Sequence, residues 1–249
     1  MCLILVAWQT HPDYPLVVAA NRDEFHARPT AALARWQDAP QVIAGRDLEA
    51  GGTWLGITDS GRFAAVTNVR EPGKPTGPCS RGGLTADFLR GDTAPSEYAR
   101  AIDGSAYSGF NLLLADRDQL CYRSNRDGAA RALPPGIYGV SNHLLDTPWP
   151  KLATAKARFH AALSGLPGTA ALFDILADRE IVPDERLPAT GVSLEWERLL
   201  SAIFVQSPGY GTRASTVLLR HADGRTHIEE RSFAATGELL QSSLISTGV

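Results

Sequence analysis

The sequence has little cysteine, little lysine and no long apolar segment. Its three cysteines, Cys2, Cys79 and Cys121, are odd in number, widely spaced and form no Cys-x-x-Cys pair. A disulfide framework or a cysteine zinc site is therefore not expected. The apolar run at residues 2–8 is too short to span a membrane and lacks the basic flank of a signal peptide. We therefore expect a cytoplasmic protein with no stable membrane insertion.

Neither sign of charge is in large excess. The chain has 24 Lys and Arg residues against 27 Asp and Glu, a formal net charge of −3, and contains no basic block or acidic tail. Nucleic acid and anionic membranes are therefore not expected as partners. Only Lys74, Lys151 and Lys156 are lysines, and with abundant alanine this bias indicates a GC-rich bacterial gene.

Apolar runs separated by turn residues predict an α+β protein built from antiparallel sheets. Strands are expected at residues 3–8, 16–21, 42–44, 53–58, 63–68, 110–115, 120–124, 137–141, 212–219, 226–233 and 239–245. Helices are expected at residues 83–89, 96–102, 149–163, 170–176 and 194–202, with an irregular loop at 69–80. Strands and helices do not alternate singly, which disfavours a doubly wound parallel sheet. With no linker or repeat, we expect a single domain over residues 1–249.

Cys2 is the candidate nucleophile. Initiator methionine is generally removed before a small residue, which would leave a thiol of pKa about 8.5 beside an α-amine of about 7.7–8.0. Together these groups form a nucleophile and its own base. Taken alone, a cysteine that begins a buried strand is more often an inert core thiol. A lipid anchor at Cys2 would need a second membrane signal, and the sequence offers none.

Polar residues gather at the predicted strand ends. The second strand leads into Asn-Arg-Asp-Glu at 21–24, and its antiparallel return brings this cluster close to Cys2. Extended geometry places Arg22 and Asp23 on opposite faces, so only part of the cluster is expected to face the thiol. Asn68 and Asn142 end two further strands, where an amide held by a strand suits an oxyanion donor or substrate clamp. Arg213, at a glycine-rich entry to a late strand, is a candidate partner for a thiolate or a substrate carboxylate. The alternative to a functional role is that the strand-end residues form solvated turns and that Arg213 is a surface arginine.

These motifs together resemble the NRDE, or transport and Golgi organization 2, family. The resemblance covers the whole chain and rests on Cys2, Asn-Arg-Asp-Glu at 21–24, Gly-Gly-Thr-Trp-Leu-Gly at 51–56, Thr-Asn-Val-Arg at 67–70, Ser-Asn at 141–142, Pro-Trp-Pro-Lys at 148–151 and Gly-Thr-Arg at 211–213. It implies the four-layer αββα fold of N-terminal-nucleophile hydrolases.

A more distant similarity runs to the choloylglycine hydrolase and penicillin V acylase group. It implies that Asn68 is an oxyanion donor, Asn142 a second active-site amide and Arg213 the late-strand arginine near the thiol. That group carries Arg-x-x-Asp at the end of its second strand. In this sequence either Arg22 takes the place of the arginine with Asp23 shifted, or Asn21 and Glu24 fall at the two positions.

The resulting hypothesis is a cysteine N-terminal-nucleophile hydrolase of a small amide or thioester, with no cofactor and no metal. Its catalytic residues are Cys2, Arg22, Asp23, Asn68, Asn142 and Arg213, and its substrate-binding residues are Asn21, Glu24, Trp54 and His143. The alternative, which the resemblance also implies, is non-enzymatic binding and trafficking of haem or of a lipid or acyl-CoA in the same cleft. The six histidines show no metal-ligand spacing, and His143 beside Asn142 is the candidate ligand under that alternative.

Overall fold

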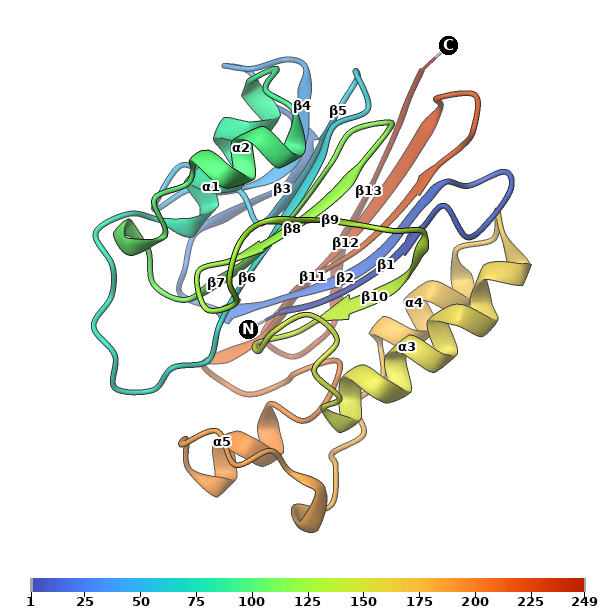
Figure 1. Cartoon of the computed structure of the whole chain (residues 1–249). Helices are drawn as coiled ribbons and strands as arrows, with labels where there is room; N and C mark the ends of the chain where they lie inside the picture. The colour runs from blue at the N-terminus through green and yellow to red at the C-terminus, as the bar shows by residue number, and fades with distance from the viewer. Residues whose placement is uncertain (1, 249) are drawn as a thin grey trace.

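Two antiparallel β-sheets face each other in the computed structural model, which describes residues 2–248 (Figure 1). The expected removal of Met1 concerns a residue outside this range. The six-stranded sheet has the order β10-β1-β2-β11-β12-β13, formed by β1 (Cys2–Trp8), β2 (Leu16–Phe25), β10 (Gly136–Val140), β11 (Tyr210–Arg220), β12 (Thr226–Phe233) and β13 (Leu239–Thr247). The seven-stranded sheet has the order β3-β4-β5-β6-β7-β8-β9, formed by β3 (Thr30–Arg35), β4 (Val42–Asp47), β5 (Leu55–Thr58), β6 (Phe63–Asn68), β7 (Phe110–Ala115), β8 (Leu120–Ser124) and β9 (Arg131–Leu133).

Helices cover the outer face of each sheet and complete four layers. Helices α1 (Arg81–Arg90) and α2 (Pro95–Ala101) lie on the seven-stranded sheet, whereas α3 (Pro150–Ala162) and α4 (Ala170–Leu176) lie on the six-stranded sheet. The short helix α5 (Leu194–Leu199) belongs to a segment that projects from one end of the sandwich. This confirms the expected αββα arrangement, in which apolar side chains fill the space between the sheets and beneath both helix layers.

Strand β1 shows why the sequences of the central strands are continuous apolar runs. Ile4 and Val6 pack between the two sheets, whereas Leu3 and Leu5 pack under α3 and α4. A strand covered on both faces can bury every side chain, because successive residues point to opposite sides.

The second strand is longer than the sequence predicts. Strand β2 continues to Phe25, so residues 21–24 lie within the strand and not in a turn after it. They stay extended because β11 pairs with them, with a bulge between Thr212 and Ala214. Two strands were also missed, β3 and β9. Both lie at the edges of the seven-stranded sheet and carry few β-branched or aromatic residues.

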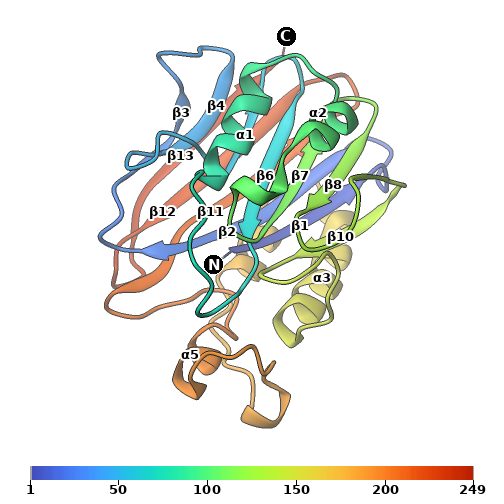
Figure 2. The same ribbon diagram turned by 60° about the vertical axis from the view of Figure 1, so that its left-hand side comes forward.

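The loop at 69–80 and the α5 segment project at the same end of the sandwich as the start of β1 (Figure 2). The opposite end is closed by large apolar side chains, including Trp8 and Phe63. Within residues 2–248, no helix combines the length and apolar character that crossing a bilayer requires.

Candidate active site

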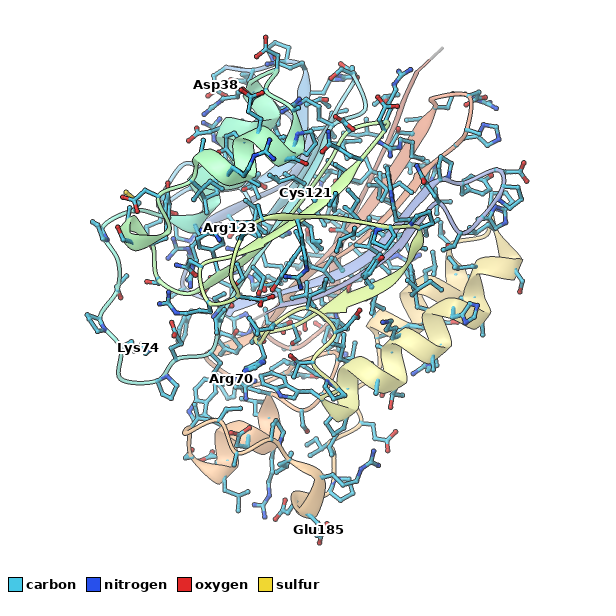
Figure 3. The ribbon with its side chains drawn as sticks, viewed as in Figure 1. Asp38, Arg70, Lys74, Cys121, Arg123 and Glu185 are labelled. Carbon is cyan, nitrogen blue, oxygen red and sulfur yellow. The ribbon has the colours of Figure 1, made fainter. Side chains whose placement is uncertain are left out.

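A cavity of about 720 Å³ opens at the end of the sandwich where β1 begins. Its walls come from the ends of β1, β2 and β6, the loop at 69–80, the first turn of α1 and the segment that carries α5. Figure 3 shows Arg70 between the sandwich and that segment, and Lys74 out on the loop. The predicted site residues that line it are Cys2, Arg22, Asp23, Glu24, Trp54 and Asn68.

Cys2 and Arg22 occupy the same face of the six-stranded sheet. They are directly opposite each other in the β1–β2 register, and directly opposed side chains in an antiparallel pair point the same way. That face is the one on which Ile4 and Ala20 contact the second sheet. Burial raises the pKa of the Cys2 thiol, although the positive charge of Arg22 acts against it. A raised pKa disfavours the thiolate, so the use of Cys2 as a nucleophile requires a base.

Arg22 is a buried cation with several partners. Its Nη1 donates to Thr30 Oγ1 at 3.1 Å, its Nη2 lies 3.9 Å from Glu24 Oε2, and its Cζ lies 4.5 Å from the centre of the Trp54 ring. The Trp54 ring in turn lies against Gly45, where an added Cβ would come within 2.1 Å of it. These contacts fix the guanidinium beside the thiol.

Asp23 lies on the other face of β2 and is buried. Its Oδ1 accepts a hydrogen bond from Thr212 Oγ1 at 2.7 Å, and its backbone carbonyl accepts one from the Tyr210 hydroxyl at 3.0 Å. Burial raises the pKa of the Asp23 carboxyl, while nearby positive charge and the Thr212 hydroxyl act to lower it. Arg22 and Asp23 therefore approach Cys2 from opposite sides of the sheet.

Lys151 supplies part of that positive charge, and the sequence analysis did not select it as a site residue. Its Nζ donates to the carbonyl of Leu200 at 2.8 Å and lies 3.4 Å from that of Ala202. Burial lowers the pKa of Lys151 to about 8, against the opposing charges of Asp23 and Cys2. A signal was present: Lys151 shares with Ala155 and Phe159 the four-residue spacing of the buried face of α3.

Asn68 and Asn142 are joined directly. Asn142 Nδ2 donates to Asn68 Oδ1 at 2.9 Å and lies 3.2 Å from the Asn68 carbonyl. The Ser141 hydroxyl contacts both the carbonyl of Cys2, at 3.1 Å, and Asn142 Oδ1, at 3.2 Å. Asn142 is fully buried behind the cavity, whereas Asn68 lines it. Because its oxygen is held by Asn142, Asn68 presents its Nδ2 donor group to the cavity.

Three predicted site residues lie elsewhere. Asn21 points toward α4, where its Nδ2 donates to the carbonyls of Leu176, at 2.8 Å, and Ile203, at 3.0 Å. His143 is outside the cavity, with its Nδ1 2.9 Å from Thr147 Oγ1. Arg213, at the β11 bulge, donates through Nη1 to the carbonyls of residues 25, 26 and 28. Asn21 and Arg213 thus bind the backbone where the sequence analysis expected contact with a substrate or thiol.

The side chains around the cavity determine whether it could bind a metal ion or haem. No histidine of the described chain lines the cavity, and residues 2–248 contain no cluster of three His, Cys, Asp or Glu side chains arranged to hold a metal ion. Among the described residues that line the cavity, Cys2 and Cys79 carry sulfurs of the kind that could hold a haem iron.

The antiparallel αββα sandwich, with a cysteine at the start of a central strand at its open end, is the fold of N-terminal-nucleophile hydrolases. A solved structure described as a Caenorhabditis elegans N-acylethanolamine-hydrolyzing acid amidase ortholog has the same fold. It superposes with a TM-score of 0.53 at 14% sequence identity, covering 88% of this chain and 92% of that chain.

The chain belongs to the Transport and Golgi organisation 2 family, whose family model matches residues 1–235. It is 39% identical to the Transport and Golgi organization protein 2 homolog of Bos taurus and 38% identical to that of Homo sapiens. Each alignment covers 93% of this chain and 93% of the relative. The family resemblance inferred from the sequence is therefore confirmed.

Proposed function

We propose that this protein is a cysteine N-terminal-nucleophile hydrolase that cleaves a small amide or thioester. One observation carries the proposal. The Ser141 hydroxyl lies within hydrogen-bond distance of both the Cys2 carbonyl and Asn142 Oδ1, and Asn142 donates to the Asn68 amide, which opens to the same cavity as Cys2. An amide donor held in this way beside a thiol suits stabilisation of an oxyanion.

The reaction would proceed in two halves after Met1 is removed. The Cys2 sulfur attacks the substrate carbonyl while the α-amine of Cys2 accepts the thiol proton, and Asn68 Nδ2 donates to the oxyanion. The carbon–nitrogen or carbon–sulfur bond then breaks, and the amine returns the proton to the leaving group. Water next attacks the acyl-enzyme and releases the acid and the free thiol. Asp23 would orient the α-amine, and Arg22 would favour the thiolate.

The name of the C. elegans protein describes hydrolysis of an N-acylethanolamine, which is an amide. That name supports the reaction type proposed for this chain, and the substrate is a separate question.

The test is covalent labelling of Cys2. Protein shown by intact mass to lack Met1 is treated with an electrophilic acyl thioester, and the adduct is located by peptide mapping. Cys79 is the matched control, because it also lines the cavity and is exposed. We expect the adduct to disappear in Cys2→Ala and to persist in Cys79→Ala. Absence of an adduct on Cys2, or loss of labelling only in Cys79→Ala, contradicts the proposal.

A second candidate function is binding of haem or of a lipid or acyl-CoA without turnover. It is favoured by the aromatic side chains in the cavity wall, Phe25, Trp54, Trp196 and Tyr210, and by a volume in the range of cofactor sites. Titration of Cys2→Ala with haem and with an acyl-CoA separates the two functions. Saturable binding equal to that of the wild type, with no turnover by the wild type, supports the binding function.

A further inference from the structure

Five cationic side chains line the cavity, and four of them already have a carboxylate partner. The pairs are Arg22 with Glu24 at 3.9 Å, Arg28 with Asp47 at 2.7 Å, Arg70 with Glu197 at 3.0 Å and Lys74 with Glu71 at 2.6 Å. The fifth, Arg81, forms no ion pair with any residue in 2–248. It is the first residue of α1, whose first turn contains no acidic side chain.

One edge of the Arg81 guanidinium remains available. Nη1 donates to the carbonyl of Gly109 at 3.2 Å, which holds the group at the cavity wall. Nε and Nη2 make no hydrogen bond with the described residues, and neither is among their buried atoms without a partner, so both remain accessible. The N–H groups on Nε and Nη2 point the same way and match the two oxygens of a carboxylate.

The surroundings of Arg81 favour an anionic occupant. Partial burial lowers the pKa of the guanidinium, while the nearby Cys2 and Glu24 act to raise it and Arg28 to lower it. An arginine side chain nevertheless stays charged at any physiological pH. A cation that is partly removed from water without a counter-ion costs free energy, and a bound carboxylate offsets that cost.

We propose that Arg81 binds a carboxylate of the substrate, so that the compound attacked by Cys2 carries a carboxylate close to its scissile carbonyl. The inference rests on the proposed hydrolase function and narrows its substrate class. Arg81 is then a specificity-determining residue: it contacts the substrate at a point away from the bond that breaks.

The test uses two matched pairs of probes. The mono-para-nitrophenyl ester of glutaric acid carries a carboxylate on the acyl side, and S-butyryl thioglycolate carries one on the leaving group. Each is compared with its neutral methyl ester in the rate of Cys2 acylation. In at least one pair the wild type should prefer the carboxylate, and Arg81→Gln should reduce kcat/KM for that probe by about 10- to 100-fold while changing the neutral probe less than about threefold.

Two further variants separate geometry from charge. Arg81→Lys keeps the charge but loses the two-pronged edge, so we expect an intermediate loss. Lys74→Gln removes a cavity cation that Glu71 already neutralises, and should change the preference less than about twofold. Thermal unfolding of each variant verifies that it is folded.

The outcomes distinguish this inference from the function on which it rests. If neither pair of probes shows a preference, or if the preference survives in Arg81→Gln, the carboxylate site is wrong and the hydrolase proposal stands. If no probe acylates Cys2, the hydrolase proposal fails, and glutarate is titrated directly into Cys2→Ala. Binding that is lost on adding Arg81→Gln supports the site, whereas absent binding or an unchanged Kd overturns it.

Discussion

At the end of strand β2, alternate side chains point in opposite directions. Arg22 and Glu24, on the inter-sheet face with Cys2, line the cavity. Asn21 and Asp23 lie on the face toward the helix layer, where Asn21 binds two backbone carbonyls, whereas Asp23 lies near Lys151 and also borders the cavity. The two-residue period of a strand therefore places Asn21 in the interior, whereas residues 22–24 border the cavity from both faces of β2.

The Asn-Arg-Asp-Glu motif therefore contributes both to the stability of the fold and to the lining of the cavity. On the helix face, Asn21 is closed off from solvent and holds β2 to the end of α4 and to the segment after α5. On the inter-sheet face, Arg22 and Glu24 border a cavity that a ligand can enter, and Asp23 borders it from the helix face. We therefore expect substitution of Asn21 to act on stability and substitutions of cavity-lining residues to act on chemistry.

The largest expected effect is that of Asn21→Leu. This change leaves the carbonyls of Leu176 and Ile203 without donors and removes the acceptor for the Ser215 hydroxyl, which lies 2.6 Å from Asn21 Oδ1. Each buried group left unpaired costs about 1–3 kcal/mol, so the free energy of unfolding should fall by about 3 kcal/mol or more. Urea denaturation measures it. The matched control is Asn68→Ala, which removes the same amide from the cavity face and should cost about 1 kcal/mol or less. Equal losses in the two variants would contradict the comparison.

Glu230 tests whether the inter-sheet face also contains a group that governs stability. It is buried on β12, where its Oε1 accepts from the Leu33 amide at 2.7 Å, and burial raises its pKa to about 7. The native state therefore holds the proton more tightly than the unfolded chain, whose carboxyl titrates near 4.5. The free energy of unfolding should thus fall as pH rises from about 4.5 to about 7, by about 3 kcal/mol in total.

Glu230→Gln should remove this fall, since an amide does not titrate, and should leave the variant more stable than the wild type at pH about 8. Urea denaturation across the pH range provides the measurement. Glu229→Gln is the control, because Glu229 points to the other face and pairs with Arg231 at 3.0 Å. A wild-type profile as flat as that of Glu230→Gln would show that Glu230 is not buried as a proton-binding group.

The third prediction concerns the cavity face. Asn68→Ala removes the amide assigned to the oxyanion, and acylation of Cys2 should slow by about 100-fold. Stopped-flow or quench kinetics with an acyl thioester measure the rate. An unchanged rate would place the oxyanion donor elsewhere.

The smallest expected effect comes from Lys151, on the helix face. Burial lowers its pKa to about 8 from 10.5, so between these values the unfolded chain binds more protons than the native state. Stability should therefore rise with pH in this window, by about 2 kcal/mol between pH about 8 and about 9.5. Lys151→Met should abolish the rise. Lys156→Met is the control, because Lys156 lies on the same helix but is partly exposed and paired with Asp146. A rise that persists in Lys151→Met would assign it to another group.

Much of the fold could be predicted from local sequence patterns. The spans of β7, β8, β12 and α4 were predicted to the residue, because alternation, turn composition and helical spacing all agree there. Strand β3 was missed, since its Thr-Ala-Ala-Leu-Ala-Arg sequence has weak strand propensity and depends on pairing with β4.

Part of the candidate site could also be predicted from local sequence patterns. Cys2 and Asn68 were found because strand ends are readable from sequence, and both line the cavity. Arg81 and Lys151 were not selected, because each lies in the first turn of a helix whose neighbours are far away in the sequence. Arg213, by contrast, was selected from the sequence but does not line the cavity. The bulge in β11 turns its side chain toward the backbone of residues 25–28.

The sequence by itself determined the layered antiparallel fold, the family and the position of Cys2 at the start of a central strand. These depend on periodicity and on motifs that lie close together in the chain. The tertiary structure alone decided which members of Asn-Arg-Asp-Glu meet the cavity, that Asn142 supports Asn68 from behind, and that Arg81 has no carboxylate partner within residues 2–248. Burial, register and charge pairing arise only when segments far apart in the sequence pack together, and no local pattern encodes them.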